Sequence, residues 1–325
     1  MTTKTLDLPA VGEPILTLKA VNKSYGTKRA AQDVNLSIPR GAIYGFLGPN
    51  GAGKTTTIRA IMKILLPDSG EIRLGGQLLD GSMRDRIGYL PEERGLYRKM
   101  KCVEQLAYLA ELKGVRRGEA IVRADHWLER LGLMEYRDRK VDALSKGMQQ
   151  KIQFAATFIA KPDLVILDEV FSGLDPLNIE LLREMILAEK ENGTTVIFST
   201  HMLAEAEKIC DAICLIEGGE VILDGTMDEV RDRFPLESVR VAWEGGAEPP
   251  AQLAGVIHRE FVEGRWQLTL AADTDPRSLL PALMEAGELT LFSANRPSLN
   301  EIFLTAVARH REEREERQER PEVQA

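Results

Sequence analysis

Short apolar runs alternate with longer amphipathic segments along most of the chain. Two stretches of alternating character, ILTLKAV and AAQDVNLSI in residues 15–38, predict two strands joined by the polar connector NKSYGTK. Residues 41–65 have the pattern of a buried strand, a glycine-rich loop and a helix. The runs PDLVILDEV and TTVIFST are short, apolar and bounded by turn residues, as buried parallel strands are. Because strands alternate with helices, we expect an α/β fold with a mostly parallel sheet covered on both faces.

The texture of the chain changes after about residue 234. The runs ESVRVAW, VIHREFV and RWQLTLA predict short strands, and a helix, a strand and a last helix follow them. This order predicts a small α+β domain. The expected organisation is a leader (1–14), a main α/β domain (15–234) with a helical subdomain at about 100–160, the small domain (235–308) and a charged tail (309–325). The tail is expected to be a solvated helix extension or disordered, and it is assigned no site.

Composition narrows the class of partner. The 325 residues carry 42 basic and 50 acidic side chains, a formal charge of −8, which repels a polyanion, so no nucleic-acid partner is expected. Three cysteines, Cys102, Cys210 and Cys214, favour a reducing compartment and buried apolar roles. No window approaches the ~20 apolar residues that cross a bilayer. If the protein serves a membrane process, another chain must supply the membrane part.

The segment GPNGAGKT, residues 48–55, matches the phosphate-loop pattern G-x-x-x-x-G-K-[ST]. Its glycines let successive backbone N–H groups point inward at phosphate oxygens, and the following helix presents its positive end to the same anion. Lys54 adds a point charge, and the Thr55 hydroxyl can bind Mg²⁺. An ordinary glycine turn would fit the bare pattern, but the flanking strand and helix disfavour it. The residues expected to hold the nucleotide phosphates are Gly48, Pro49, Asn50, Gly51, Ala52, Gly53, Lys54, Thr55 and Thr56.

Two acids end the apolar run LVILDEV. In an open parallel sheet, ligands bind beyond the carboxyl ends of the strands, so Asp168 and Glu169 are expected beside the phosphate loop. Asp168 can hold Mg²⁺, usually through water, and Glu169 can polarise an attacking water molecule. The alternative is that both acids merely terminate a strand.

Five segments, in order along residues 15–232, resemble the nucleotide-binding subunits of ABC transporters. GPNGAGKTTT and LVILDE resemble the two Walker motifs of that family, and SGLD, residues 172–175, resembles its D-loop. His201 stands where the family has its switch histidine, which implies a contact with the γ-phosphate, and Tyr25 stands where an aromatic ring stacks on adenine. The resemblance implies a P-loop NTPase cassette with a mixed sheet, flanking helices and a helical subdomain, which binds ATP and Mg²⁺.

The stretch LSKGMQQK, residues 144–151, resembles the family's Leu-Ser-Gly-Gly-Gln signature with two departures, Lys146 and Met148. In the family, two cassettes pair head to tail, and the signature of one closes over the ATP of the other. The resemblance therefore implies that Ser145, Lys146 and Gly147 act in trans on the nucleotide of a partner. The alternative is an unrelated helix start capped by a serine.

Four carried-over roles have plainer alternatives or departures. Tyr25 would otherwise be a surface aromatic, and His201 would be a neighbour of a helix N-cap without a ligand. Asp175, the D-loop aspartate, can also cap the turn before Pro176, and both roles can hold together. Glu92 stands in GYLPEERGLY where the family usually has glutamine, and its carboxylate can still ligate Mg²⁺.

The segments YLPEERGLY, LSKGMQQK and RPSLNEIFL resemble the sodium- and drug-exporter branch, which carries a small C-terminal domain. The resemblance implies a peripheral ATP-hydrolysing subunit at the cytoplasmic face of the cell membrane, with separate integral membrane permease chains. It also implies a second ATP-binding subunit, for which an identical chain in a homodimer is expected and a diverged cassette is the alternative. The competing interpretations are a non-transport ABC ATPase acting on ribosomes or nucleic acid, and a P-loop kinase. The cargo is not encoded in this chain.

Overall fold

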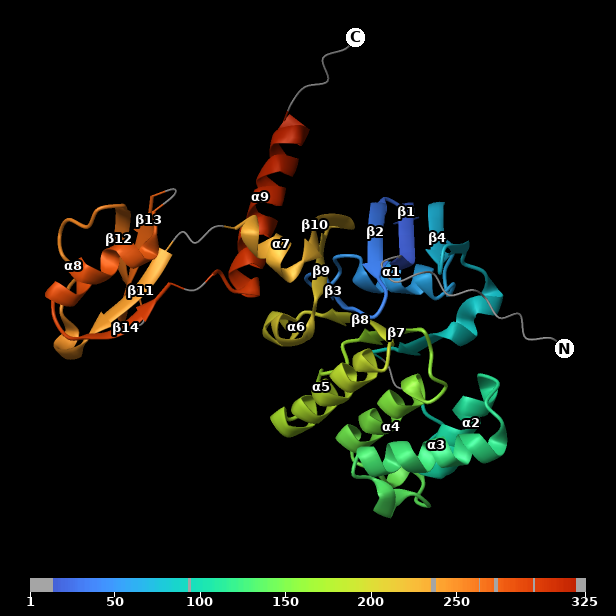
Figure 1. The fold of residues 1–325 in the computed structure, drawn as a ribbon. Coiled ribbons are helices and arrows are strands. Elements are labelled where there is room, and N and C mark those ends of the chain that lie inside the picture. Colours follow the sequence, from blue (N-terminus) through green and yellow to red (C-terminus); the bar gives the residue numbers. More distant parts are fainter. Residues whose placement is uncertain are drawn as a thin grey trace, which may run out of the picture. The chain divides into compact units, whose positions relative to one another are not determined.

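The computed structural model describes residues 14–92, 95–234, 238–262, 264–271, 274–294 and 296–319. The expected leader falls, except for Pro14, outside the described residues, as do the last six residues of the expected tail. The chain forms two compact units (Figure 1). One comprises the described residues up to Met227 and those from Ala306 onward, and the other spans Asp228–Thr305. These divisions differ from the boundaries at 234/235 and 308/309 drawn from the sequence, because a single helix continues across the second one.

An antiparallel sheet begins the first unit, in the order β2-β1-β4-β5. Its strands are β1 (Pro14–Tyr25), β2 (Lys28–Pro39), β4 (Ser69–Leu74) and β5 (Gln77–Leu78). The sequence places a polar connector between β1 and β2, and this expectation is wrong for most of its length. Tyr25 pairs with Lys28, so the two strands continue through exposed polar positions to a tight turn. Ladder hydrogen bonds hold this end of the hairpin, where the side chains bury little.

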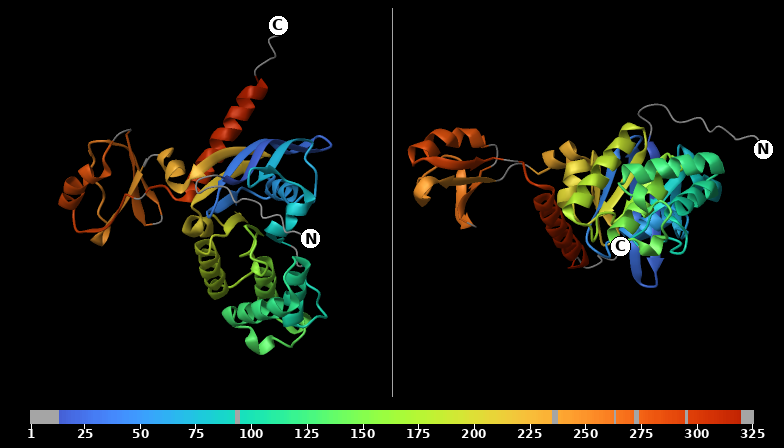
Figure 2. Two further views of the ribbon diagram at one scale, coloured as in Figure 1. Left: turned by 45° about the vertical axis from the view of Figure 1, so that its right-hand side comes forward. Right: turned by 90° about the horizontal axis from the view of Figure 1, so that it is seen from below.

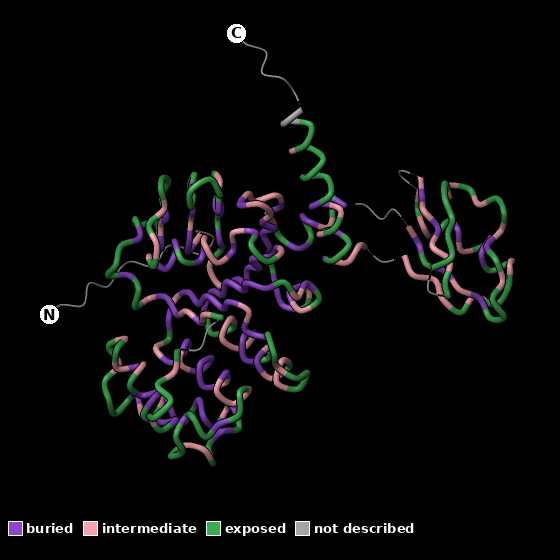
Figure 3. The backbone as a smooth tube through the Cα atoms, turned by 180° about the vertical axis from the view of Figure 1, so that it is seen from behind, coloured by how far each residue is buried: buried purple, intermediate pink, exposed green. Residues whose placement is uncertain are grey.

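A six-stranded sheet forms the centre of the unit, in the order β10-β9-β3-β8-β7-β6. All neighbours are parallel except β9 and β10, so the mixed sheet predicted from the sequence is confirmed. Figure 3 shows buried backbone concentrated in this part of the molecule. The strands are β3 (Ile43–Leu47), β6 (Ile87–Leu90), β7 (Leu164–Asp168), β8 (Thr195–Thr200), β9 (Ala212–Glu217) and β10 (Glu220–Thr226).

Helices cover both faces of this sheet. Ile58 and Ile61 of α1 (Lys54–Ile61) lie in one buried cluster with Leu18 of β1 and with Phe46 and Ile166 of the central sheet. The helix therefore joins the two sheets through a shared apolar core. Helix α6 (Leu203–Ile209) packs on the central strands β3 and β8, and helix α5 (Pro176–Glu191) packs on β8.

Three helices form a separate layer between β6 and β7 in sequence: α2 (Cys102–Leu112), α3 (Arg117–Arg130) and α4 (Lys146–Phe158) (Figure 2). Their aromatic core contains Trp127, Phe154 and Phe158, with the two phenylalanine centroids 4.8 Å apart. Short 3₁₀ turns lie at Gly81–Arg86, Met134–Tyr136 and Val141–Ala143. The layer places the start of α4, which carries Ser145 as its N-cap, on an exposed end.

The second unit is an antiparallel sheet with one covering helix. Its strands β11 (Ser238–Trp243), β12 (Val256–Val262), β13 (Arg265–Leu270) and β14 (Leu289–Ser293) lie in the order β12-β13-β11-β14. The indole Nε1 of Trp243 donates to the carbonyl of Leu283 in α8 (Leu280–Glu285) at 2.9 Å, inside the core. Remaining elements are α7 (Met227–Asp232), the 3₁₀ turns Glu244–Gly246 and Pro276–Leu279, and α9 (Leu299–Glu319). None of the helices in the described ranges is long and apolar enough to cross a bilayer.

The parallel strands end together at one edge of the central sheet. The chain leaves β3 into residues 48–53, β6 toward Glu92, β7 into Glu169 and β8 into His201. This register gathers the residues singled out from the sequence at the edge where open α/β sheets bind ligands.

Candidate active site

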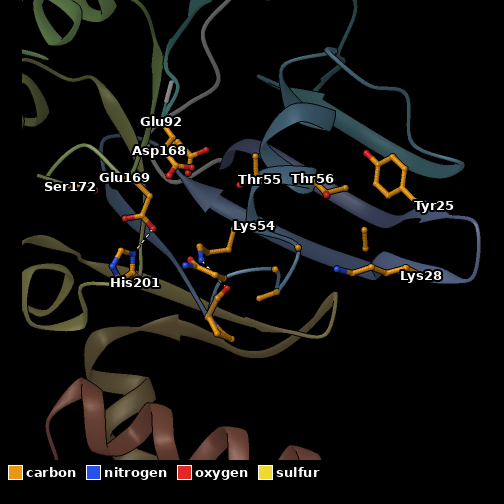
Figure 4. Close-up of a pocket in the computed structure, with 16 residues that line it drawn as sticks. Tyr25, Lys28, Lys54, Thr55, Thr56, Glu92, Asp168, Glu169, Ser172 and His201 are labelled. Carbon is orange, nitrogen blue, oxygen red and sulfur yellow. Dashed lines mark hydrogen bonds and ion pairs between the residues drawn. The ribbon is translucent and has the colours of Figure 1, made fainter. Parts of the chain in front are cut away.

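A cleft of about 270 Å³ lies at this edge (Figure 4). It brings together most of the residues predicted from the sequence, although they come from five separate segments. Tyr25 lies at one end and His201 at the other, with the glycine-rich loop between them. The lining residues are Tyr25, Lys28, Ala30, Pro49, Asn50, Gly51, Ala52, Gly53, Lys54, Thr55, Thr56, Glu92, Asp168, Glu169, Ser172 and His201.

The loop backbone has room for glycine alone at two positions. Gly48 has φ 149°, and a Cβ there would lie 2.2 Å from the carbonyl oxygen of Ile216. Gly53 has φ 113°, and its Cβ would lie 2.3 Å from the carbonyl oxygen of Ala30. Both positions combine a left-handed or extended-positive backbone with contact against neighbouring backbone. The loop is therefore held close to β2 and β9 in a conformation that larger residues cannot adopt.

Lys54 is nearly buried, with 6% of its surface exposed. Its Nζ donates to the carbonyl oxygens of Gly48 at 2.6 Å and Pro49 at 3.1 Å, which fixes the ammonium over the loop. Burial lowers the pKa of Lys54, against the attraction of the Glu169, Asp168 and Glu92 carboxylates. A bound phosphate would offset this burial penalty by favouring the charged ammonium.

The N-terminus of α1 faces the same space. Gly53 is the N-cap, and within the described chain no side chain bonds to the first-turn N–H groups of this helix. Helix starts of this kind bind anions through those N–H groups and the helix dipole. Thr55 and Thr56 lie in this first turn and line the cleft.

Asp168 is a buried carboxylate at the end of β7, with 3% of its surface exposed. Ser199 Oγ donates to its Oδ1 at 2.8 Å. Burial raises the pKa of Asp168, and the negative charges of Glu169 and Glu92 add to the rise. The Ser199 hydrogen bond and the charge of Lys54 act in the opposite direction. A cation beside this carboxylate would therefore favour its ionised form.

Glu169 and His201 contact each other just beyond the carboxyl ends of the neighbouring strands β7 and β8. Nδ1 of His201 lies 2.9 Å from Oε1 of Glu169, and Thr200 Oγ1 donates to the other carboxylate oxygen at 3.4 Å. The Glu169 backbone sits in the left-handed region at φ 53° and donates its N–H to the carbonyl of Ser199 at 2.9 Å. Strained non-glycine positions of this kind cluster at functional sites. The arrangement can hold a carboxylate as a base with an imidazole to orient it.

The residues fit a magnesium ion only together with a nucleotide. Thr55, Glu92 and Asp168 line one cleft, yet no group of three His, Cys, Asp or Glu side chains in the described residues is placed to hold a metal alone. Mg²⁺ is typically held by one or two carboxylates together with water and the phosphates of the substrate. The hydroxyl and two carboxylates present here suit that donor set.

Tyr25 is 52% exposed at the turn of the β1–β2 hairpin, and Lys23 Nζ lies 5.8 Å from its ring centroid. Its open ring face suits a planar base better than a core role. Lys28, Ala30 and Ser172 also line the cleft, although the sequence motifs assign none of them a role in the site. Lys28 lies three residues after Tyr25 and pairs with it across the hairpin, so a correct strand register would have revealed it.

The residues of the LSKGMQQK stretch do not line the cleft of their own chain. Ser145 caps α4, accepting a hydrogen bond from the N–H of Met148 at 3.3 Å, and Lys146 is exposed. Asp175 likewise caps α5 by accepting a hydrogen bond from the N–H of Asn178 at 3.0 Å. The hydrogen bonds that Asp175 accepts from the backbone and the side chain of Asn178 lower the pKa of Asp175. The capping roles considered for both residues are thus present, and neither capped end is buried.

A second cavity of about 230 Å³ adjoins the acidic side of the cleft and shares Glu92, Asp168 and Glu169 with it. Gln150 and Gln153 of α4 line this cavity, and both donate to backbone carbonyls across it: Gln150 to Val170, and Gln153 to Pro91 at 3.4 Å. Neither glutamine is assigned a role by the sequence motifs. Their proximity to the three acidic residues depends on where α4 packs in the fold, which the sequence pattern alone does not reveal.

Two family models match the chain. One, described as ABC transporter, covers residues 31–172. The other, described as ATP-binding protein DrrA1-3-like, C-terminal domain, covers residues 225–307.

Curated relatives and solved structures agree with these matches. The chain is 38% identical to the uncharacterized ABC transporter ATP-binding protein YhaQ of Bacillus subtilis, over 90% of this chain and 98% of that protein. It is 33% identical to the daunorubicin/doxorubicin resistance ATP-binding protein DrrA of Streptomyces peucetius, over 90% and 92% of the two chains. A solved structure of an ATP-binding subunit of an ABC transporter superposes with a TM-score of 0.64 at 34% identity, covering 68% of this chain and 93% of that one.

Proposed function

This chain belongs to the ABC transporter ATP-binding proteins, and from that premise we propose that its cleft binds Mg-ATP and hydrolyses it to drive export through membrane partners. The predicted family, the cassette fold and the ATPase activity are confirmed by the comparisons, and the predicted small C-terminal domain matches the DrrA1-3-like C-terminal family. The relatives named as transporter subunits disfavour the two alternatives, a non-transport ABC ATPase acting on ribosomes or nucleic acid and a P-loop kinase. The observation that carries the site assignment is the buried Lys54 at the centre of a glycine-built cleft.

The nucleotide is held from its two ends. The backbone N–H groups of the loop and the start of α1 bind the phosphates, with the Lys54 ammonium as a point charge among them. The Tyr25 ring stacks on the base, and Lys28 lies beside it at the same end of the cleft. These contacts orient the terminal phosphate toward Glu169 and His201.

Glu169 acts as the general base toward a water molecule, and His201 orients it. The carboxylate accepts a proton from the attacking water at Oε1 or Oε2 as the water oxygen bonds to the terminal phosphorus and the bond from that phosphorus to the bridging oxygen breaks, which releases ADP and phosphate. His201 Nδ1 and Thr200 Oγ1 hold the two carboxylate oxygens in place. Bound Mg²⁺ would neutralise phosphate charge, and Thr55, Asp168 and Glu92 would hold it. Ser199 keeps the Asp168 carboxylate aimed into the cleft.

A second copy of the chain completes the site. Ser145, Lys146 and Gly147 lie on an exposed helix start outside their own cleft, which is the position needed to contact a nucleotide on another molecule. The N-terminus of α4 supplies N–H groups and the Ser145 hydroxyl to the terminal phosphate, and the Asp175 turn lies at the same interface. Hydrolysis then releases the two copies.

Integral membrane permease chains are the partners that this ATPase drives, from the cytoplasmic face of the membrane. The similarity to DrrA, whose name records resistance to daunorubicin and doxorubicin, supports the export direction. ATP thereby powers a cycle of association and release that the membrane chains convert into transport.

Trapping the dimer tests this proposal. Glu169→Gln is expected to bind Mg-ATP and to elute as a dimer at millimolar Mg-ATP, whereas Glu169→Gln combined with Ser145→Arg binds ATP and stays monomeric. Lys54→Ala is the control for the cleft and is expected to bind no ATP. Retained ATP affinity in Lys54→Ala would reject the site assignment. A dimer that forms despite Ser145→Arg would reject the trans role of the signature. Affinity purification from membranes should recover a multi-span membrane protein, and recovery of ribosomes instead would overturn the transport role.

A further inference from the structure

The turn between β9 and β10 lies directly against the phosphate loop. Gly218 and Gly219 form it with φ of 59° and 88°, and Glu217 pairs with Glu220 across it. Such a two-residue turn requires left-handed backbone at both positions, which glycine allows. Gly219 donates its N–H to the carbonyl of Ala52 at 2.8 Å, in the middle of the loop.

A second bond set ties the same turn to β2. The backbone N–H of Gln32 donates to the Gly219 carbonyl at 2.8 Å, and Gln32 Nε2 donates to the Gly218 carbonyl at 2.6 Å. A Cβ on Gly53 would lie 3.3 Å from the Gly219 Cα, so loop and turn are in contact. The turn therefore connects the phosphate loop, through hydrogen bonds to its backbone, with the β1–β2 hairpin that carries Tyr25.

Side chains of the C-terminal helix α9 also contact this turn and the strand ends that flank it. Arg311 donates through Nη2 and Nε to Oε1 of Glu217, at 2.8 and 3.2 Å. The Glu217 side chain is only 13% exposed. His310 Nε2 lies 3.6 Å from Oε2 of Glu220, and the Arg314 guanidinium lies over Gly218, where a Cβ would come within 2.5 Å of Nη1. One short stretch of helix therefore contacts both strand ends and the turn between them.

We propose that Arg311, with His310 and Arg314 beside it, is a positioning residue for the phosphate loop, acting through the β9–β10 turn. The chain of contacts has two links, from the guanidinium to Glu217 and from Gly219 to the Ala52 carbonyl. Anchoring Glu217 fixes the turn, and the fixed turn holds the loop backbone in the shape that presents its N–H groups to phosphate. Loosening α9 then lowers nucleotide affinity without altering the residues that perform hydrolysis.

This role gives the C-terminal part of the chain a physical route to the nucleotide. Helix α9 starts at Leu299 in the second compact unit and ends in the first, so it joins the two units covalently, and its contacts with the β9–β10 turn continue the route to the loop. An ion pair with an exposed partner is weakened by salt, and Arg311 is 64% exposed. The affinity for nucleotide should therefore carry a salt-sensitive component that disappears when Arg311 is replaced.

The inference rests on the proposed assignment of residues 48–55 to the nucleotide, and the experiment separates the two. Equilibrium binding of a fluorescent ADP, and KM and kcat for ATP, are measured on the full chain. Arg311→Glu is expected to raise the nucleotide Kd and the KM about fivefold, at the low end of couplings between sites, with kcat at saturation unchanged. Arg311→Lys should stay close to the parent, as should the matched control Glu312→Gln, whose side chain is exposed on the same helix.

The charge exchange Arg311→Glu with Glu217→Arg should restore most of the affinity. If Arg311→Glu does not fold, Arg311→Ala removes the ion pair without a charge clash and takes the same measurements. An unchanged Kd in folded Arg311→Glu or folded Arg311→Ala would overturn the inference, and so would an equal rise in Glu312→Gln. Nucleotide binding that survives Lys54→Ala would instead refute the loop assignment itself.

Discussion

Nδ1 of His201 lies 2.9 Å from Oε1 of Glu169, and this contact joins the ends of the adjacent parallel strands β7 and β8. The pair is 32 residues apart in sequence, so only the register of the two strands brings it together. Glu169 is held there by its left-handed backbone and by its N–H bond to the Ser199 carbonyl. The backbone conformation and this hydrogen bond therefore fix the position of Glu169, independently of its side-chain contact with His201.

Glu169→Gln should lower kcat for ATP hydrolysis at least about 100-fold, since a positioned general base typically contributes that much or more. The amide retains the size of the side chain and its contact with His201, so the Kd for ATP should change less than about threefold. Phosphate release at saturating ATP and equilibrium nucleotide binding check the two halves. Turnover equal to the parent would remove Glu169 from the role of base.

His201→Ala should lower kcat about 10- to 100-fold while nucleotide affinity is largely kept, because the histidine orients the base and lies at the far end from Tyr25. In a double variant with Glu169→Gln, the loss should be much smaller than the product of the two single losses, as it is for residues that act as one unit. Fully multiplicative losses would show that His201 acts independently of Glu169.

Much of the site was predictable because its chemistry is local in sequence. GPNGAGKT carries its glycines, Lys54 and Thr55 in one stretch, and LVILDEV carries Asp168 and Glu169 at the end of one strand. Those motifs need no tertiary information beyond the rule that parallel strands end at one edge. The C-terminal unit was also predictable, because its short alternating strands follow the uniformly apolar strands of the central parallel sheet, such as LVILD and TVIFST.

The residues that were missed depend on tertiary placement. Lys28 enters the cleft because the β1–β2 ladder runs to Tyr25, through positions whose polar pattern predicts a connector. Gln150 reaches the acidic cavity only through the packing of α4. Arg311 was counted in a charged tail without a site, since nothing in its sequence points to Glu217, 94 residues earlier. Periodicity indicates what is buried, but not which exposed charge meets which.

Tyr25→Ala should raise the Kd for ATP about tenfold, because stacking of an aromatic ring on a base contributes roughly 1–3 kcal/mol. Tyr25→Phe keeps the ring and serves as the matched control, with affinity close to the parent. The Kd for inorganic triphosphate, which has no base to stack, should be the same in all three proteins. Equal loss of triphosphate and ATP affinity would mean that the alanine variant disturbs the hairpin instead of the stacking.

Gly53→Ala and Gly51→Ala form a matched pair in the loop. Both glycines have positive φ, so both variants incur the left-handed penalty of roughly 1 kcal/mol. Only at Gly53 does the added Cβ also collide with backbone, 2.3 Å from the Ala30 oxygen, whereas at Gly51 nothing lies within 4 Å. Gly53→Ala should therefore lower the free energy of unfolding by about 1–3 kcal/mol more than Gly51→Ala, measured by urea denaturation. Equal losses would mean that the loop is free to move away from β2.

Asp168→Asn should stabilise the nucleotide-free protein in a pH-dependent way while it reduces ATP hydrolysis. Burial raises the pKa of Asp168 above its ordinary value of 3.8, so the folded state binds this proton more tightly than the unfolded chain. The contribution of Asp168 to the stability of the parent is therefore greatest below pH 4, and it falls as the pH rises from there through the raised pKa. Asparagine has no proton to lose and still accepts the Ser199 hydrogen bond, so its stability lacks this fall with pH.

The difference in unfolding free energy between variant and parent should be near zero below pH 4. It should grow with pH to a plateau of about 1.4 kcal/mol for each unit by which the pKa is raised. Urea denaturation between pH 3.5 and 8 measures it, and a difference that is constant across this range would show that Asp168 is not held in a destabilising, ionised form.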